Sequence, residues 1–316
     1  MKSSFIHIGG FLGATAFGFL PAVALAYTIT NTSAPIRGDF VLEPAKIEIV
    51  ADPGHQSVTE MRVTNRTNEA LTYYVSIEDT KGSDNPQSPI MLMGSEEGPY
   101  SLRDYIKPEI DTFTLRPGEQ IALPVTVTIP GDAEPGGLYG SVLFESRSEG
   151  DIKASGSHTI SRLGALLFVR VSGEVKEEGA LEDFRIAGGS SVFFKQQPMD
   201  FELLYRNSGD VHLNPYGMIT VRNVFNMPVA EVEVQPYFAM PQSLRYRKVT
   251  WEHGPLFGVY RATAEINRGY GDIIENRSVM FTVLPWKEML IALGLIIILV
   301  FVGKWFFTTF EFTRKK

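Results

Sequence analysis

The chain has 316 residues with 29 Lys and Arg, 36 Asp and Glu and no cysteine, which excludes disulfides and thiolate metal sites. Between two terminal apolar stretches, residues 27–285 hold 23 basic and 34 acidic residues, a net charge of −11. Such an acidic surface repels phosphate backbones, so nucleic-acid binding is not expected. Without disulfides these residues must be stabilised by core burial, and there are enough of them for two domains of ordinary size.

The N-terminus has the pattern of a secretory signal peptide. Lys2 precedes an apolar run at 5–20, and Pro21 is followed by Ala24-Leu25-Ala26. A positive residue, an apolar segment and small residues before a cleavage point are typical of such peptides. We therefore expect residues 1–26 to be removed on export and residues 27–38 to be an N-terminal linker.

The C-terminus has the pattern of a membrane anchor. Residues 289–310 are apolar except for Lys304 and two threonines, with Trp286 before them and three basic residues at the end of the chain. About 20 apolar residues at ~1.5 Å each cross a ~30 Å hydrocarbon core. The alternative is a buried core helix, but the segment has no polar face to leave in water. The sequence predicts a transmembrane helix at 285–310, a basic cytoplasmic tail at 311–316, and domains held outside the membrane.

Between these segments the apolar residues recur with a period of two. Several short strands with turn signals between them indicate an all-β sandwich instead of alternating strands and helices. Helix is scarce, with one or two turns expected at 101–106. The expected strands include 58–63, 71–77, 121–129, 138–144, 163–171, 201–205, 218–221, 230–234, 247–251 and 260–266.

A loose internal repeat sets the domain count. One apolar strand runs into Asn65 and a polar turn, and another runs into Asn207 and a similar turn. Tyrosines at 139 and 260 follow glycine at the start of late strands, as in the tyrosine corner of immunoglobulin-like sandwiches. We predict two tandem immunoglobulin-like β-sandwiches at 39–173 and 174–284, separated by the charged run 174–179. A single large sandwich remains an alternative.

Two segments are unusually long for connections inside a compact domain. The segment 146–161 is polar and reads as the exposed tip of a hairpin. The segment 79–111 is an inserted loop, and loops of this length are usually functional or disordered. Its apolar and aromatic residues are the predicted partner-binding residues: Met91, Leu92, Met93, Tyr100 and Tyr105. Methionine adapts to varied surfaces, so 91–93 is the preferred contact, whereas Tyr105 is at least as compatible with packing on the sandwich.

The sequence contains no pattern for catalysis or for a cofactor. The five histidines lack metal-ligand spacing, and there is no phosphate-binding glycine loop with a lysine. His212 lies close to Asp210 in a turn, where a structural hydrogen bond is expected. We therefore predict no enzyme activity, no cofactor, and no catalytic or metal site. A hydrolase would need a pair of carboxylates converging in a cleft.

Several stretches together resemble a known family. The segments 101–106 (SLRDYI), 113–119 (FTLRPGE) and 129–140 (IPGDAEPGGLYG) are similar to the first domain of bacterial WxL-interacting surface proteins. The segments 205–217 (YRNSGDVHLNPYG) and 244–247 (LRYR) resemble the second domain. The resemblance implies tandem immunoglobulin-like domains on a single anchor, the first associated with peptidoglycan and the second with proteins, and secreted WxL proteins as partners. More broadly, the chain resembles pilus-chaperone-like sandwiches.

These features lead to one functional hypothesis and one alternative. The hypothesis is a non-enzymatic, single-pass protein of the cell membrane, with its domains at the cell surface or in the periplasm. It would bind or present a secreted or cell-surface protein, because sandwich edges can accept an added strand. The alternative is an adhesion or structural protein of the envelope that binds cell-wall glycan or peptidoglycan, and exposed aromatic residues at 100 and 105 would favour it.

Overall fold

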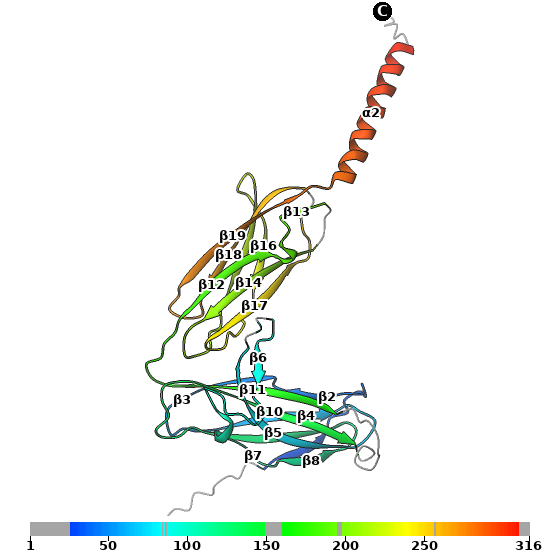
Figure 1. Cartoon of the computed structure of the whole chain (residues 1–316). Coiled ribbons are helices and arrows are strands. Elements are labelled where there is room, and N and C mark those ends of the chain that lie inside the picture. The colour runs from blue at the N-terminus through cyan, green and yellow to red at the C-terminus, as the bar shows by residue number, and fades with distance from the viewer. Residues whose placement is uncertain are drawn as a thin grey trace, which may run out of the picture.

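Two β-sandwiches and a C-terminal helix make up the protein, and one end of the second sandwich lies against the side of the first (Figure 1). The computed structural model describes residues 26–83, 85, 87–148, 160–194, 198–255 and 257–309. Nearly all of the expected signal peptide 1–26, the expected tail 311–316 and most of the tip of the 146–161 hairpin lie outside this described part.

The first sandwich contains two sheets facing one another. One has the strand order β1-β9-β4-β2, with β7 also pairing with β9, and the other has the order β3-β11-β10-β5-β6, with β8 pairing with β5. All these pairs are antiparallel except β3 with β11. The strands are β1 (Thr28–Asn31), β2 (Phe40–Glu43), β3 (Lys46–Ala51), β4 (Gln56–Asn65), β5 (Leu71–Gly82), β6 (Ile90–Leu92), β7 (Ile106–Pro108), β8 (Thr112–Leu115), β9 (Glu119–Thr128), β10 (Gly136–Ser148) and β11 (Ser161–Val171).

The core of the first sandwich follows from the alternation in its strands. In β9, Ile121, Leu123 and Val125 are fully buried, because successive side chains of a strand point to opposite faces. Tyr73 of β5 and Phe144 of β10 pack against them from the opposite sheet. The run of alternating residues predicted at 121–129 is therefore confirmed as a strand whose apolar face forms the core.

The second sandwich repeats this plan with its own core. Its sheets have the orders β12-β14-β17 and β13-β19-β18-β15-β16, and a separate apolar cluster fills the space between them. The strands are β12 (Gly179–Ile186), β13 (Val192–Phe193), β14 (Met199–Asn207), β15 (Tyr216–Asn223), β16 (Pro228–Val234), β17 (Ser243–Trp251), β18 (Gly258–Asn267) and β19 (Ile274–Val283).

The two asparagines noted in the sequence perform the same task in both sandwiches. Asn65 ends β4, and its buried amide donates to the carbonyl oxygens of Glu69 and Leu115, both at 2.9 Å. Asn207 ends β14 and donates in the same way to Val211 at 2.8 Å and Ala239 at 2.9 Å. Each amide thus satisfies backbone carbonyls that the departing chain would leave unpaired. The structure confirms two tandem immunoglobulin-like sandwiches.

The helix α2 (Trp286–Thr309) follows β19 after only Leu284 and Pro285. The stretch Trp286–Phe306 is long and apolar enough to cross a membrane, and it packs against neither core. Crossing a bilayer would remove these exposed apolar side chains from water, which agrees with the predicted anchor.

Three expectations about local structure need adjustment. Residues 27–38, expected as a linker, contain β1, which pairs with β9 and whose Thr-Ile-Thr-Asn sequence is too short to show a clear period. The segment 79–111 is not an open loop, because it contains the end of β5, β6, the 3₁₀ helix η1 (Arg103–Tyr105) and β7. Only Tyr260 has the expected corner geometry, with its hydroxyl donating to the Phe257 carbonyl at 2.6 Å.

Candidate protein-binding surface

A buried carboxylate organises the segment 79–111. Asp79 lies near the end of β5 and is fully buried. Its two oxygens accept hydrogen bonds from the backbone amides of Gly98 at 3.0 Å, Leu102 at 3.0 Å and Arg103 at 2.9 Å. One side chain thereby holds three backbone amides that lie 19 to 24 residues further along the chain.

The charge of Asp79 is stabilised by these contacts. Burial alone would raise the pKa of this carboxyl group, since it disfavours the ionised form. The amides of Gly98, Arg103 and Leu102 and the Ser101 side chain bond to the carboxylate and hold its pKa below the ordinary value. At neutral pH an ionised carboxylate at the start of the segment therefore holds residues 98–103 in place.

The pinned segment presents β6 as an edge strand. Residues 90–92 pair antiparallel with residues 80–82 of β5, and β6 ends its sheet in the described part of the chain. Met91 and Leu92 are 41% and 40% exposed. An unpaired strand edge with exposed apolar side chains is suited to binding an added strand or an apolar surface.

The other predicted contact residues lie elsewhere. Met93 is half-buried, and its amide donates to the Asp79 carbonyl at 2.9 Å. Tyr100 is half-buried with its ring edge-on to Tyr139, and the centroids are 6.0 Å apart. Tyr105 lies in η1 and packs against the first core. Of the five predicted residues, only Met91 and Leu92 are exposed, one on each face of the β6 edge.

The β5–β6 hairpin also reaches the second sandwich (Figure 1). Ile90 and Tyr100 pack in a small apolar cluster whose buried members are Tyr139, Phe168 and Met240. Met240 lies between β16 and β17, so this cluster joins the two sandwiches. We call it the junction cluster. The exposed edge of β6 is therefore directly connected to the contact between the sandwiches.

A neutral histidine provides the polar part of this contact. The backbone amide of His212 donates to the Tyr139 hydroxyl oxygen at 2.6 Å, and Nδ1 lies 3.2 Å from the same oxygen. Nε2 lies 3.6 Å from a Glu48 carboxylate oxygen. The pKa of His212 is lowered to about 4, chiefly by burial; the Glu48 carboxylate opposes this, and the positive charges of Lys46 and Arg170 add to it. The ring is therefore uncharged at neutral pH.

This pairing differs from the one expected within the turn. The sequence suggested that His212 bonds to Asp210, but its described partner is Tyr139, which is 73 residues away. The carbonyl of Asp210 instead accepts a hydrogen bond from Gly137 at 3.3 Å, which is a second bond between the sandwiches. No local sequence signal reveals a partner so distant along the chain.

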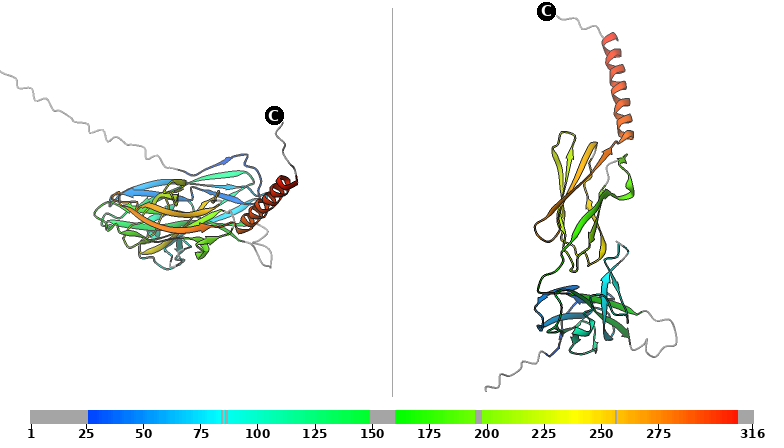
Figure 2. Two further views of the ribbon diagram at one scale, coloured as in Figure 1. Left: turned by 90° about the horizontal axis from the view of Figure 1, so that it is seen from above. Right: turned by 60° about the vertical axis from the view of Figure 1, so that its left-hand side comes forward.

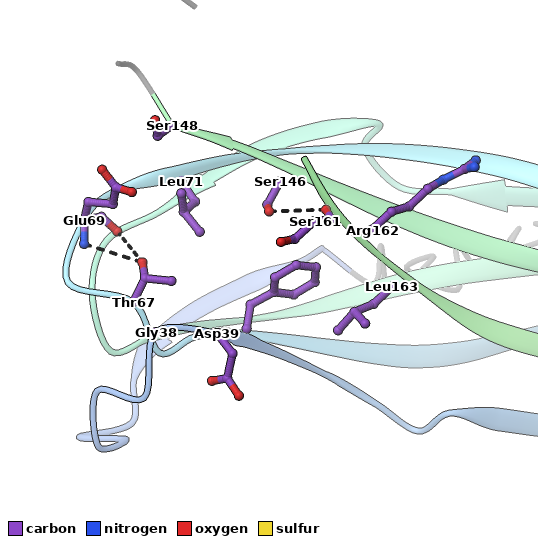
Figure 3. Close-up of a pocket in the computed structure, with 11 residues that line it drawn as sticks. Gly38, Asp39, Thr67, Glu69, Leu71, Ser146, Ser148, Ser161, Arg162 and Leu163 are labelled. Atoms are coloured by element: carbon purple, nitrogen blue, oxygen red, sulfur yellow. Dashed lines mark hydrogen bonds between the residues drawn. The ribbon is translucent and has the colours of Figure 1, made fainter. Parts of the chain in front are cut away.

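A hollow at the β2–β11 side of the first sandwich does not bring carboxylates together (Figure 3). It has a volume of about 440 Å³ and is lined by residues of β2, β5, β10, β11 and nearby turns. Asp39 and Glu69 border it but point in opposite directions, and Asp39 is held by Arg66 through two hydrogen bonds. Among the described residues no three His, Asp or Glu side chains gather in a way that could hold a metal ion.

Comparisons with known proteins bear on the fold. No protein-family model matches the sequence, and no curated protein is significantly similar to it. Solved structures with distantly similar folds include several pilus chaperones. The class 5 fimbriae chaperone CfaA has 11% identity and a TM-score of 0.37, with 77% of this chain and 99% of that chain covered. The Pseudomonas aeruginosa CupB2 chaperone has 9% identity and a TM-score of 0.36, with 77% and 100% covered. The E. coli chaperone DraB has 14% identity and a TM-score of 0.34, with 79% and 98% covered. These likenesses are distant, and the sandwich fold of this chain rests on its own strand pairing.

Proposed function

We propose that this chain is a non-enzymatic, single-pass protein of the cell envelope that holds a secreted or surface protein through its first sandwich. The helix α2 supplies the anchor, with the sandwiches outside the membrane and the C-terminus in the cytoplasm. The resemblance of 101–106 and 205–217 to WxL-interacting surface proteins supports a secreted protein as the partner.

The observation that carries this proposal is the exposure of Met91 and Leu92 on β6, an edge strand held in place by its pairing with β5. Exposed apolar side chains on a mobile loop lose conformational entropy when they bind. Here the Asp79 hydrogen bonds fix residues 98–103, and pairing with β5 holds β6. Binding therefore gains the burial of two side chains without ordering the loop that carries them.

The proposal is tested by cross-linking in intact cells. A photoreactive amino acid at Met91 should capture a specific secreted protein, whereas the same group at Val58, which is also exposed, should not. The captured protein, once purified, should bind the full chain at least about tenfold less tightly when Met91 and Leu92 are both changed to serine. About 1.4 kcal/mol corresponds to tenfold, and burying the exposed 41% and 40% of these two side chains is together worth roughly 1.2–2.4 kcal/mol. Equal capture at 91 and 58, or unchanged affinity with an unchanged melting temperature, would refute this binding site.

A further inference from the structure

The end of the second sandwich that adjoins α2 carries a second unusual surface. Strand register brings four segments to this end, because Gly258 and Phe193 both pair with Val283, and Asn223 pairs with Tyr260. The β15–β16 turn, the start of β18 and the ends of β13 and β19 therefore lie near the base of the helix. The right-hand view of Figure 2 shows the helix leaving from this end, away from the first sandwich.

Large apolar side chains are exposed at this end. Phe225 is 78% exposed and Val224 66%, both in the β15–β16 turn. Exposed apolar residues scattered singly are normal on a protein surface, but a cluster at one end indicates a contact. We call this cluster the helix-proximal rim, and its members are Phe194, Val224, Phe225, Met227, Phe257 and Met280.

The turn holds these side chains outward in a fixed conformation. The side-chain oxygen of Asn223 accepts hydrogen bonds from the amides of Phe225 at 3.0 Å and Met227 at 3.1 Å. Arg222 Nη1 donates to the carbonyl of Asn226 at 3.0 Å, and Asn226 has a positive φ of 61°. The turn is thus closed by its polar groups while its apolar groups face solvent. This arrangement resembles a prepared contact surface more than a loosely ordered loop.

Two arginines lie beside the rim. Arg222 and Arg261 are register partners on β15 and β18, and they line a hollow of about 460 Å³ with Val224, Val259 and Met280. Within the described residues neither arginine forms an ion pair with a carboxylate. The rim therefore combines cations with apolar side chains on a chain whose outer part is acidic overall.

The short connection between β19 and α2 limits how far the helix-proximal rim can lie from the start of the helix. Leu284 and Pro285 alone separate β19 from α2, and two residues span at most about 7 Å. Trp286 begins the helix, and tryptophan prefers the membrane–water interface. If α2 spans the bilayer, the rim is held against the headgroups.

We infer that the helix-proximal rim inserts its apolar side chains into the outer leaflet beside α2, with Arg222 and Arg261 contacting lipid phosphates. The bilayer is the occupant, because apolar residues flanked by cations suit an anionic interface. Val224, Phe225 and Phe257 enter the boundary between headgroups and acyl chains. This inference rests on the proposed membrane anchor and adds a second, surface-bound contact to it.

The absence of cysteine allows a direct test in the full chain. Single cysteines replace Phe225, Phe257, Val50 or Leu299, and each carries an environment-sensitive NBD probe. The protein is reconstituted into phosphatidylcholine vesicles with or without phosphatidylglycerol and with spin-labelled lipids. Val50 is the matched control, since it is 74% exposed but lies on β3 of the first sandwich. Leu299, in the middle of α2, reports on the anchor.

Probes at 225 and 257 should be blue-shifted and quenched by lipids labelled near the headgroup, whereas the probe at 50 should not. Adding Arg222→Gln and Arg261→Gln should remove at least half of the extra quenching that phosphatidylglycerol produces at 257. Quenching at 299 without quenching at 225 and 257 would overturn the inference that the rim enters the membrane, but it would support the anchor. No quenching at 299 by deeply labelled lipids would refute the anchor itself. Probes at 225 and 257 that are shielded from aqueous iodide but not quenched by labelled lipids would indicate a second copy of the chain, which also overturns the inference.

Discussion

Replacing Asp79 by alanine should destabilise the first sandwich more than any other single carboxylate change in the segment 79–111. The substitution leaves the amides of Gly98, Leu102 and Arg103 without their acceptors. A buried donor left unsatisfied costs about 1–3 kcal/mol. Since Gly98 and Arg103 are only half-buried and water can reach them, we expect a total loss of about 3–5 kcal/mol in the free energy of unfolding.

Asp79→Asn should cost less, because its carbonyl oxygen can still accept from Leu102 and Arg103. Only the bond from Gly98 is lost, together with the charge, so about 1–2 kcal/mol is expected. Glu97→Gln is the matched control, since Glu97 is an exposed carboxylate in the same segment. It should change the free energy of unfolding by less than about 0.5 kcal/mol. The measurement is urea unfolding of a soluble form ending at Pro285, followed by circular dichroism.

The pH dependence provides an independent check. The pKa of Asp79 is lower in the folded state, so the unfolded state binds more protons as the pH falls below the ordinary value of 3.8. The stabilisation is therefore complete above that pH and is lost as the pH falls through the folded-state pKa. The difference between the parent and Asp79→Asn should shrink in the same range. If Asp79→Ala unfolds at the same urea concentration as Glu97→Gln, the carboxylate does not pin the segment.

Two further predictions concern the contact between the sandwiches. A Cβ atom built on Gly82 would lie 2.4 Å from Cβ of Ser243, so Gly82→Val should separate the sandwiches and raise the radius of gyration in X-ray scattering. Gly131→Val is the control, because a Cβ there meets nothing within 4 Å, and equal scattering from both variants would contradict this contact. The pKa of His212 is lowered from 6.5 to about 4, so the unfolded state binds more protons between these values and stability falls as the pH drops through that window. The expected loss is about 2–3 kcal/mol. It should be detected as a lower melting temperature at pH 4.5 than at pH 7, and His212→Gln should reduce this difference; an equal difference in both proteins would exclude the histidine as its source.

The parts predicted from sequence are those fixed by local chemistry. The alternation in β9 identifies a half-buried strand without reference to its neighbours, and Asn65 and Asn207 mark strand ends because their side chains bond to nearby backbone. The short strands β1 and β6 are too brief to show a period, and pairing with longer strands defines them.

The candidate site can be predicted only in part from local sequence chemistry. The apolar character of Met91 and Leu92 in a polar segment predicts a contact, and the structure places both on an exposed edge. The role of Asp79 depends on amides 19 to 24 residues away, and no pattern in the chain specifies such a fold-back. Phe225 could have been found, since Val-Phe-Asn-Met occupies a turn where polar residues are usual.

The two-residue connection between β19 and α2 has a consequence for how a partner would be encountered. With α2 as the proposed anchor, a long linker would let the sandwiches move through a broad volume above the membrane, and a partner bound to them would sample every height and orientation within it. Leu284 and Pro285 allow little of this freedom, and the junction cluster joins the first sandwich to the second. A partner held at β6 would therefore be confined to a thin layer at nearly constant height. Confinement to such a layer raises the effective concentration at which neighbouring captured molecules meet, which favours lateral assembly across the surface over escape from it.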